Sequence, residues 1–574
     1  MNSETKICQN CKKDFTIEPE DFKFYEKISV PSPTFCPHCR YIRRLLDRNE
    51  WTLYQRKCDA TGENIVSIYK PEVPFPVYRQ AEWWSDKWDA LSYGQEIDFS
   101  RPFFEQFDEL SRKVPHLAIV NSKSTNSEYT NQSEENKDCY MLAACGKNEK
   151  CMYSNWLQDS NYFVGDSYCL EKSELCYESL NCTRCHTSIY LHDSADCISC
   201  HFSIDLRGCS NCFGCVGLRN KNYCFFNKQL SKEEYEKRTE ELLGTRDGIH
   251  RAQEKFREFS LKFPRKFYHG TKNMEFISGD YIEETGRTRE SFNCRHNENV
   301  GYSQDAWYSK DSLDITEIWA ELSYECQGCA VISRSIALRS TWDAFDSYYT
   351  NMSFGCSNLF GCIGLRQKHN CILNKQYSKE DYDELKAKLI EHMKKTGEWG
   401  EYFPASISPF AYNECTAWDY CPLSKEEAIA KGYTWYDRPE RDYKITIQAR
   451  DLPETIGEVG DGILKEVIGC DSQTSDEKKK NHPICTTAFQ IHPMELEFYR
   501  KMNLPLPIKC FSCRRTDRFA LRNPRQLWHR VCMCEIKNHD WHASGKCNNE
   551  FETSYAPDRP DIIYCEKCYN QEIV

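Results

Sequence analysis

The stretch GCSNCFGCVGLRNKNYCFFNKQLSKEEY, Gly208 to Tyr235, recurs 147 residues later as GCSNLFGCIGLRQKHNCILNKQYSKEDY, Gly355 to Tyr382. The match reaches back to ELCYESLNC, which starts at Glu174, and to ELSYECQGC. Both copies close on Ser-Lys-Glu, an N-cap residue and an acidic first turn, which predicts the start of a charged helix. The chain therefore contains two related modules in series, each followed by a helix.

Short apolar runs alternate with turn residues inside the first module. CYML, CMYS, NYFV, SYCL, LCYE, SIYL, CISC and FSID follow one another about every 8 to 12 residues, a pattern typical of strands with no room for crossover helices. Two architectures fit, a β-sandwich and a parallel β-solenoid. The recurrent small Cys, Ser and Asn side chains favour the narrow interior of a solenoid.

The cysteine pairs of the first module have the spacing of metal ligands, and the second module tests that interpretation. Four of these cysteines are replaced there by residues that suit a packed interior: Cys185 by Ile332, Cys197 by Ala344, Cys200 by Ser347 and Cys212 by Leu359. A metal site would not survive such replacements, so buried free thiols are the better interpretation.

A second duplication joins the two ends of the chain. FCPHCRYIRRLLDRNEWTLYQRKC, Phe35 to Cys58, matches KCFSCRRTDRFALRNPRQLWHRVC, Lys509 to Cys532, at an offset of 474 residues. The match extends upstream without a gap, from CKKDFTIEPEDFKFYEKI to CTTAFQIHPMELEFYRKM. A gapless match of this length indicates a duplicated domain.

Each copy carries a candidate zinc site. The first has two Cys-x2-Cys knuckles, and the second has a histidine at the first ligand position, which is the commonest replacement for a thiolate on zinc. The predicted ligands are Cys8, Cys11, Cys36 and Cys39 in the first copy, and His482, Cys485, Cys510 and Cys513 in the second. A second ligand pair that opens a helix resembles the treble-clef class of zinc finger.

A further finger follows the second copy. Its predicted ligands are Cys534, Cys547, Cys565 and Cys568, with Cys532, His539 and His542 as competing candidates. Two to three zinc ions are therefore expected, all in the end domains.

Arginines concentrate on the predicted helix after each second knuckle. Cys36 to Lys57 carries a net charge of +4 and Lys509 to Val531 one of +6. The arginines are Arg40, Arg43, Arg44 and Arg48 in the first copy, and Arg514, Arg515, Arg518, Arg522 and Arg525 in the second. Two interpretations stay open: the guanidinium groups clamp nucleic-acid phosphates, or they pair with the acidic body of the chain.

Charge and cysteine content restrict the class of protein. The 574 residues include 75 basic and 87 acidic ones, a net charge of −12, which argues against a surface that coats nucleic acid. MNSETKICQN is not a secretion leader, and no apolar run reaches the roughly 18 residues of a membrane helix. We expect a cytoplasmic protein without membrane association, whose 35 cysteines serve as metal ligands or free thiols.

Catalytic motifs are scarce. The sequence has no GxxxxGK[ST], GxSxG or HExxH motif, each of which would indicate a known chemistry. NHDWH, Asn538 to His542, is reminiscent of metal-dependent nucleases. The sequence leaves three functions open: binding of nucleic acid or a ribonucleoprotein through the arginines, a scaffold that binds protein partners along the β modules, and a nuclease. An enzyme is the least expected.

The chain resembles a group of uncharacterised cysteine-rich zinc-ribbon proteins that is abundant in candidate-phyla bacteria. The motifs that carry the resemblance are CPHCRYIRRLLDRN, KCDATGENIVSIY, WWSDKWDALSYGQEIDFSRPFFEQF, AYNECTAWDYCPLSKEEA and YAPDRPDIIYCEKCYNQE. The resemblance implies a modular architecture that contains zinc, and no activity.

The predicted fold is multi-domain α+β, with treble-clef-like zinc domains at both ends of two tandem cysteine-rich β-solenoid modules joined by charged helices. The expected divisions are a zinc domain (1–65), a connecting segment (66–119), the first module (120–230), a helical linker (231–285), the second module (286–377), a helix and connector (378–440), the second zinc domain (441–533) and a final finger (534–574).

Overall fold

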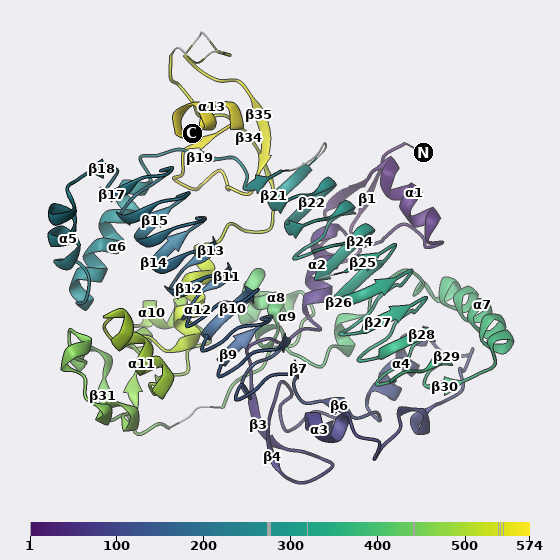
Figure 1. Ribbon diagram of the computed structural model, residues 1–574. Helices are drawn as coiled ribbons and strands as arrows, with labels where there is room; N and C mark the ends of the chain where they lie inside the picture. Colours follow the sequence, from purple (N-terminus) through teal and green to yellow (C-terminus); the bar gives the residue numbers. More distant parts are fainter. Residues whose placement is uncertain are drawn as a thin grey trace.

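Two parallel β-solenoids form the centre of the molecule in the computed structural model, which describes residues 2–272, 277–317, 319–439, 442–537, 539, 541–542 and 545–573. Together they have about 20 turns between residues 121 and 372, and Figure 1 shows them side by side. Cys200 pairs in parallel with Cys212, and Cys212 with Cys224, so each turn takes 12 residues. This pairing confirms the solenoid and excludes the sandwich.

The first solenoid runs from residue 121 to residue 229 and the second from residue 270 to residue 376. The first contains β7 (Asn121–Ser122), β8 (Ser133–Glu134), β9 (Tyr140–Ala143), β10 (Met152–Gln158), β11 (Tyr168–Glu171), β12 (Glu174–Tyr177), β13 (Leu180–Thr183), β14 (His186–His192), β15 (Ile198–Ile204), β16 (Ser210–Phe213), β17 (Asn222–Phe225) and β18 (Lys228–Gln229). The second contains β20 (Gly270–Thr271), β21 (Ile277–Glu283), β22 (Gly286–Arg295), β23 (Glu298–Gly301), β24 (Lys310–Glu317), β25 (Ala320–Glu321), β26 (Tyr324–Ser333), β27 (Trp342–Phe345), β28 (Phe354–Phe360), β29 (His369–Ile372) and β30 (Lys375–Gln376). The second solenoid starts earlier than the predicted residue 286. The prediction missed its first turns because they lack the cysteine and serine repeat.

The backbone of the solenoids turns at every third residue. In one turn the residues with positive φ are Leu175, Glu178, Asn181 and Arg184, at 48° to 53°. The residue after each of these corners points inward. A left-handed backbone conformation is unfavourable for residues other than glycine. The backbone hydrogen bonds to the neighbouring turns must therefore hold these corners in place.

Small polar side chains fill the interior in a way that makes serine and cysteine equivalent. Ser179 Oγ donates to Tyr177 O at 3.1 Å and accepts from Leu191 N at 3.4 Å. Cys139 Sγ likewise donates to a backbone carbonyl, that of Lys137, at 3.3 Å and accepts from Cys151 N at 3.4 Å. The Cys-x2-Cys spacing of the modules is therefore the three-residue period of the interior, and the interpretation as core thiols agrees with the structure.

Charged helices follow each solenoid, as expected. α5 (Lys232–Glu240) and α6 (Arg246–Ser260) follow the first, and α7 (Lys379–Thr396) follows the second. Ser231 Oγ accepts from Glu234 N at 3.2 Å, and Ser378 Oγ accepts from Asp381 N at 3.1 Å, so both serines are N-caps.

The two end domains share one order of elements. The first contains β1 (Glu4–Ile7), β2 (Asp14–Ile17), α1 (Pro19–Lys27), α2 (Pro37–Leu45), β3 (Tyr54–Lys57) and β4 (Asn64–Ser67). The second contains β32 (Ile468–Gly469), β33 (Ala488–Phe489), α11 (Pro493–Met502), α12 (Phe511–Ala520), β34 (Trp528–Val531) and β35 (Glu550–Thr553). The duplication read from the sequence is thus also a structural one.

Shorter elements fill the space between these units. They are β5 (Val77–Tyr78), α3 (Gln80–Trp83), η1 (Ala90–Tyr93), α4 (Phe103–Ser111), β6 (His116–Leu117), β19 (Arg265–Lys266), η2 (Ala405–Ile407), η3 (Tyr412–Glu414), α8 (Thr416–Tyr420), α9 (Lys425–Ala430), β31 (Ile447–Gln448), η4 (Ala449–Asp451), η5 (Ile456–Glu458), η6 (Asp461–Lys465), η7 (Asp471–Gln473), α10 (Asp476–Asn481), β36 (Ile563–Tyr564) and α13 (Glu566–Ile573). Within the described ranges, none of the helices has the length and apolarity needed to span a membrane.

The end domains dock crosswise. α1 and α2 lie on the second solenoid, whereas α11 and α12 lie on the first (Figure 1). Tyr25 of α1 packs edge-on against Tyr324, with ring centroids 5.4 Å apart. Tyr499 of α11 packs in the same way against Tyr177, at 5.8 Å. Each end domain therefore packs on the solenoid that is farther from it along the chain.

Candidate metal centres and arginine helices

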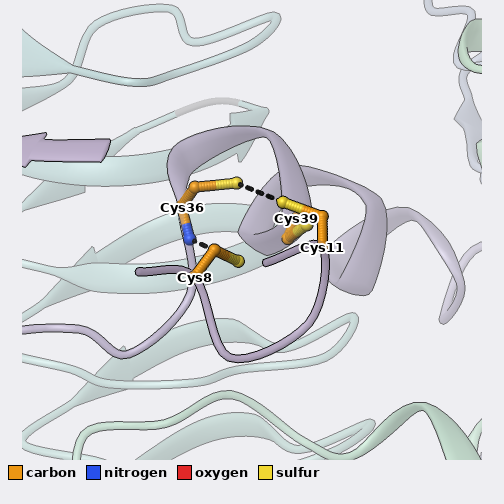
Figure 2. Close-up of side chains that lie close together, drawn as sticks. All are labelled: Cys8, Cys11, Cys36 and Cys39. Atoms are coloured by element: carbon orange, nitrogen blue, oxygen red, sulfur yellow. Dashed lines mark hydrogen bonds between the residues drawn. The ribbon is translucent and has the colours of Figure 1, made fainter. Parts of the chain in front are cut away.

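Four thiols converge in the first end domain. Cys8 follows β1, Cys11 lies in the turn before β2, Cys36 is the N-cap of α2, and Cys39 lies in its first turn (Figure 2). The Sγ atoms of Cys11 and Cys36 are 3.7 Å apart, close to the edge of about 3.8 Å that metal–sulfur bonds of about 2.3 Å give a tetrahedral ion. The predicted ligand set is thus brought together.

Hydrogen bonds prepare this group for a cation. Cys36 N donates to Cys8 Sγ at 3.2 Å, and Asn10 Nδ2 donates to Cys39 Sγ at 3.4 Å. Donation from the Cys36 thiol lowers the pKa of Cys39 to about 4, although burial opposes the shift. Such a thiolate is what a metal ion requires.

The second end domain holds a matching group of Cys470, Cys485, Cys510 and Cys513. Cys485 Sγ lies 3.8 Å from Cys510 Sγ, and Cys470 Sγ lies 3.9 Å from Cys513 Sγ. Cys510 N donates to Cys470 Sγ at 3.2 Å, which is the bond that Cys36 N makes to Cys8. Cys470 is therefore the equivalent of Cys8.

The structure does not bring His482, a predicted ligand, into this group. Its Nε2 lies 2.8 Å from Asp517 Oδ1, and its Nδ1 lies 3.0 Å from Lys478 O. The second copy contains an insertion, with η7 and α10, between its first and second ligands. A gapless alignment cannot represent an insertion, so it set a histidine at the position that Cys470 fills. The signal that could have identified Cys470 as the first member of the group is the short strand before it, which pairs with β33.

The last finger holds a third thiol group, Cys532, Cys547, Cys565 and Cys568. Cys547 Sγ lies 3.9 Å from Cys565 Sγ, and Cys565 N donates to Cys532 Sγ at 3.2 Å. Cys532 takes the position predicted for Cys534, because it ends β34 at the turn of the hairpin. In the first copy, Cys58 follows β3 at the same point. Cys532 and Cys547 therefore lie in the hairpin loop of the second copy, whereas Cys565 follows β36 and Cys568 lies in the first turn of α13.

Cys534 belongs to a fourth group, with His539, His542 and Cys568. The NHDWH motif, which suggested a nuclease, thus places its two histidines beside cysteine sulfurs. Its Asn538 lies outside the described residues. The described residues thus hold four such groups, more than the two to three zinc ions predicted. Each group offers four protein donors, an arrangement typical of structural sites, whereas catalytic sites keep an open position.

The arginines of α2 are buried against carboxylates of the second solenoid. Arg40 lies 2.9 Å from Asp314, and Arg44 lies 3.1 Å from Asp314 and 3.2 Å from Glu325. Arg43 lies 2.7 Å from Glu325. The side chain of Arg44 is 0% exposed.

The arginines of α12 make the same contacts with the first solenoid. Arg514 lies 3.1 Å from Asp166, and Arg518 lies 3.3 Å from Asp166 and 3.2 Å from Glu178. Burial raises the pKa of Glu178 to about 7, against the opposing effect of Arg518. The charge of Glu178 therefore depends on the nearby Arg518.

The core of the contact is repeated in both copies, whereas Arg43 has no arginine counterpart, because Asp517 takes its position at the offset of 474. Arg40 and Arg44 correspond to Arg514 and Arg518 at the offset of 474, and Glu178 corresponds to Glu325 at the offset of 147. A tyrosine on the preceding turn completes each cluster. Tyr302 OH donates to Asp21 at 2.9 Å and Tyr153 OH donates to Glu495 at 3.1 Å, again at equivalent positions.

The remaining predicted arginines are also held by groups of this chain. Arg48 lies 2.6 Å from Glu50, Arg515 lies 3.1 Å from Asp419, Arg525 lies 2.8 Å from Asp305, and Arg522 lies with its guanidinium carbon 3.7 Å from the ring centre of Phe519. Contact of these side chains with phosphate would require these interactions to break.

Each end domain also touches the other solenoid through the segment after its arginine helix. Asn131 Nδ2 of the first solenoid donates to Asn49 O at 2.7 Å, and Asn155 Nδ2 donates to Glu50 Oε2 at 2.8 Å. In the second copy, Ser554 Oγ donates to Asp280 of the second solenoid. The end domains therefore hold the two solenoids together.

Neither a scan against protein-family models nor a search of curated proteins found a match to this chain.

Proposed function

We propose that the protein is a zinc-stabilised scaffold that presents its paired solenoids to a protein partner. The observation that carries this proposal is the burial of both arginine helices in equivalent ion pairs with the solenoids. Arginines buried in this way attach the end domains to the solenoids. They are therefore not available as the main contacts to an external polyanion. Binding of nucleic acid or a ribonucleoprotein is the competing proposal.

The finer properties of the end domains belong to the same proposal. Thiolate and imidazole donors at tetrahedral spacing favour zinc over harder cations, and a knuckle followed by a ligand pair at a helix start supports the treble-clef class. All cysteines are free thiols, which supports a reducing compartment such as the cytoplasm.

A stripe of exposed apolar side chains on the second solenoid is the candidate surface for the partner. Tyr308, Trp319 and Val331 stack on successive turns and are 52%, 44% and 46% exposed. The rings of Tyr308 and Trp319 lie 6.0 Å apart, and His296 stacks on Tyr308 at 4.7 Å. Exposed aromatic groups of this kind are enriched at protein interfaces.

Substitution of the buried arginines separates the two proposals. We expect Arg44→Met and Arg518→Met each to lower the free energy of unfolding by about 3–5 kcal/mol, because each substitution removes one of the cations that neutralise a buried carboxylate pair. Arg450→Met, whose side chain is 82% exposed, serves as the matched control and should change little. Urea denaturation with excess zinc measures the effect.

The same variants are then titrated with a single-stranded oligonucleotide at increasing salt. The scaffold proposal expects weak binding without a steep salt slope in any variant. Wild-type stability in Arg44→Met and Arg518→Met, combined with loss of a steep, salt-dependent affinity, would instead establish the nucleic-acid proposal.

A further inference from the structure

We propose that the last finger is a binuclear metal centre in which the Sγ atom of Cys568 bridges two ions. Cys568 is the only residue that the third and fourth groups of the described residues share. The donor atoms of each group lie within 4.8 Å of one another. The inference stands apart from the scaffold function, because it concerns the internal chemistry of one domain.

The fourth group has the dimensions of a tetrahedral site. Cys534 Sγ lies 3.5 Å from His539 Nδ1, and Cys568 Sγ lies 3.5 Å from His542 Nε2. His539 Nδ1 lies 3.0 Å from His542 Nε2. Bonds of about 2.3 Å to sulfur and about 2.0–2.1 Å to nitrogen give tetrahedral edges of about 3.6 Å between sulfur and nitrogen and about 3.3 Å between nitrogens. The observed spacings fit these edges.

A carboxylate fixes the orientation of one imidazole. His539 Nε2 lies 2.8 Å from Glu572 Oε1 of α13, so Nε2 carries the proton and the lone pair of Nδ1 faces the group. The His539 side chain is 2% exposed, and Cys534 and Cys568 are 0% exposed. Two buried sulfurs and two ring nitrogens directed at one point match the requirement of a cation, as in sites where a carboxylate positions a ligating histidine.

The shared thiolate is consistent with the charge of the centre. Cys532, Cys534, Cys547, Cys565 and Cys568 supply five thiolates, and His539 and His542 supply two neutral imidazoles. Two divalent ions leave this set of seven donors with one net negative charge. A single ion in the third group would leave Cys534 and both histidines buried around a point without a cation.

Cadmium NMR on the full chain tests the bridge. After exchange with ¹¹³Cd, we expect four resonances from the four groups, two of which are mutually coupled through the shared sulfur. The variant with both His539→Ala and His542→Ala should keep three ions by native mass spectrometry and lose the coupling. Glu572→Gln should keep four ions and lower the affinity of one of them by about 10-fold or more.

His482→Ala is the matched control, because this histidine lies near a thiol group without belonging to it. It should retain four ions and the coupled pair. Three ions in the wild-type chain, or four cadmium signals without coupling, would overturn the proposal. Loss of an ion in the control would overturn the assignment of the groups on which it rests.

Discussion

The inward positions of the solenoids accept cysteine and serine because both side chains perform one task. Each donates to a carbonyl two residues earlier and can accept from a backbone N–H one turn later, as Ser179 and Cys139 do. Sulfur adds dispersion contacts in an interior too narrow for larger side chains. The abundance of cysteine here is therefore a packing property.

Cys182→Ser tests this equivalence at one residue. We expect a stable, folded chain with unchanged metal content and a loss of about 1 kcal/mol in the free energy of unfolding, because a slightly smaller hydroxyl replaces the thiol. Cys36→Ser, in the first end domain, should lose one ion. Denaturation with parallel metal analysis checks both, and release of metal by Cys182→Ser would contradict the packing role.

The same residues explain what sequence reasoning could reach. Cys-x2-Cys arises both from a zinc knuckle and from a three-residue interior period. Four replacements in the second module, such as that of Cys185 by Ile332, distinguished the two. Cys8, Cys11, Cys36 and Cys39 were identifiable because all four ligands lie in two compact pairs. Cys470 was missed because an insertion separates it from its partner.

At the scale of elements, α2 and α12 depart from the usual amphipathic arrangement, in which the charged face of a helix is exposed. Their charged faces are buried on stacked carboxylates of the solenoids, where Asp314 and Glu325 lie on consecutive turns. The sequence marked both helices as basic, yet their partners lie hundreds of residues away. Local periodicity carries no information on such pairing, so the choice between phosphate and carboxylate needed the fold.

The start of the second solenoid contains a pH-dependent link to the hairpin of the second end domain. His269 Nδ1 lies 3.0 Å from Asp280 Oδ1, and Asp280 also accepts from Ser554. Burial alone would lower the pKa of His269, but Asp280 and Asp193 raise it to about 9. The stabilisation is fully present below the ordinary value of about 6.5 and is lost as the pH rises through about 9.

His269→Gln should therefore destabilise the protein in a pH-dependent manner. We expect a loss on the order of 2 kcal/mol at pH 6, which shrinks toward zero above a pH of about 9 because the wild-type imidazolium is then neutral as well. Thermal unfolding across this range, with zinc in excess, measures the difference. His250→Gln on α6, where the side chain is 67% exposed, should show none, and a constant loss in His269→Gln would refute the ion pair.

At the scale of the molecule, two duplications combine into one pseudo-symmetric assembly. Two copies of an end domain and two copies of a solenoid meet in two equivalent contacts, which explains why the chain carries the same piece at both ends. The duplications and the solenoid class were readable from the sequence. The crosswise docking was not, because each partner surface lies on the more distant module and neither surface differs locally from its counterpart.

Crosswise docking makes the two halves of the chain mutually dependent. A cut at Gly244, between α5 and α6, would give half-chains of residues 1–243 and 244–574, and each half would carry a domain whose binding surface lies on the other half. We expect the coexpressed half-chains to complement one another as a stable heterodimer and each half alone to aggregate, since its carboxylate stack would lack arginines. Size-exclusion chromatography of the coexpressed and separate halves tests this expectation, and two well-folded monomeric halves would contradict it.

By the same reasoning, two intact chains could exchange their end domains. Slow, concentration-dependent dimerisation by domain swapping is therefore expected after refolding.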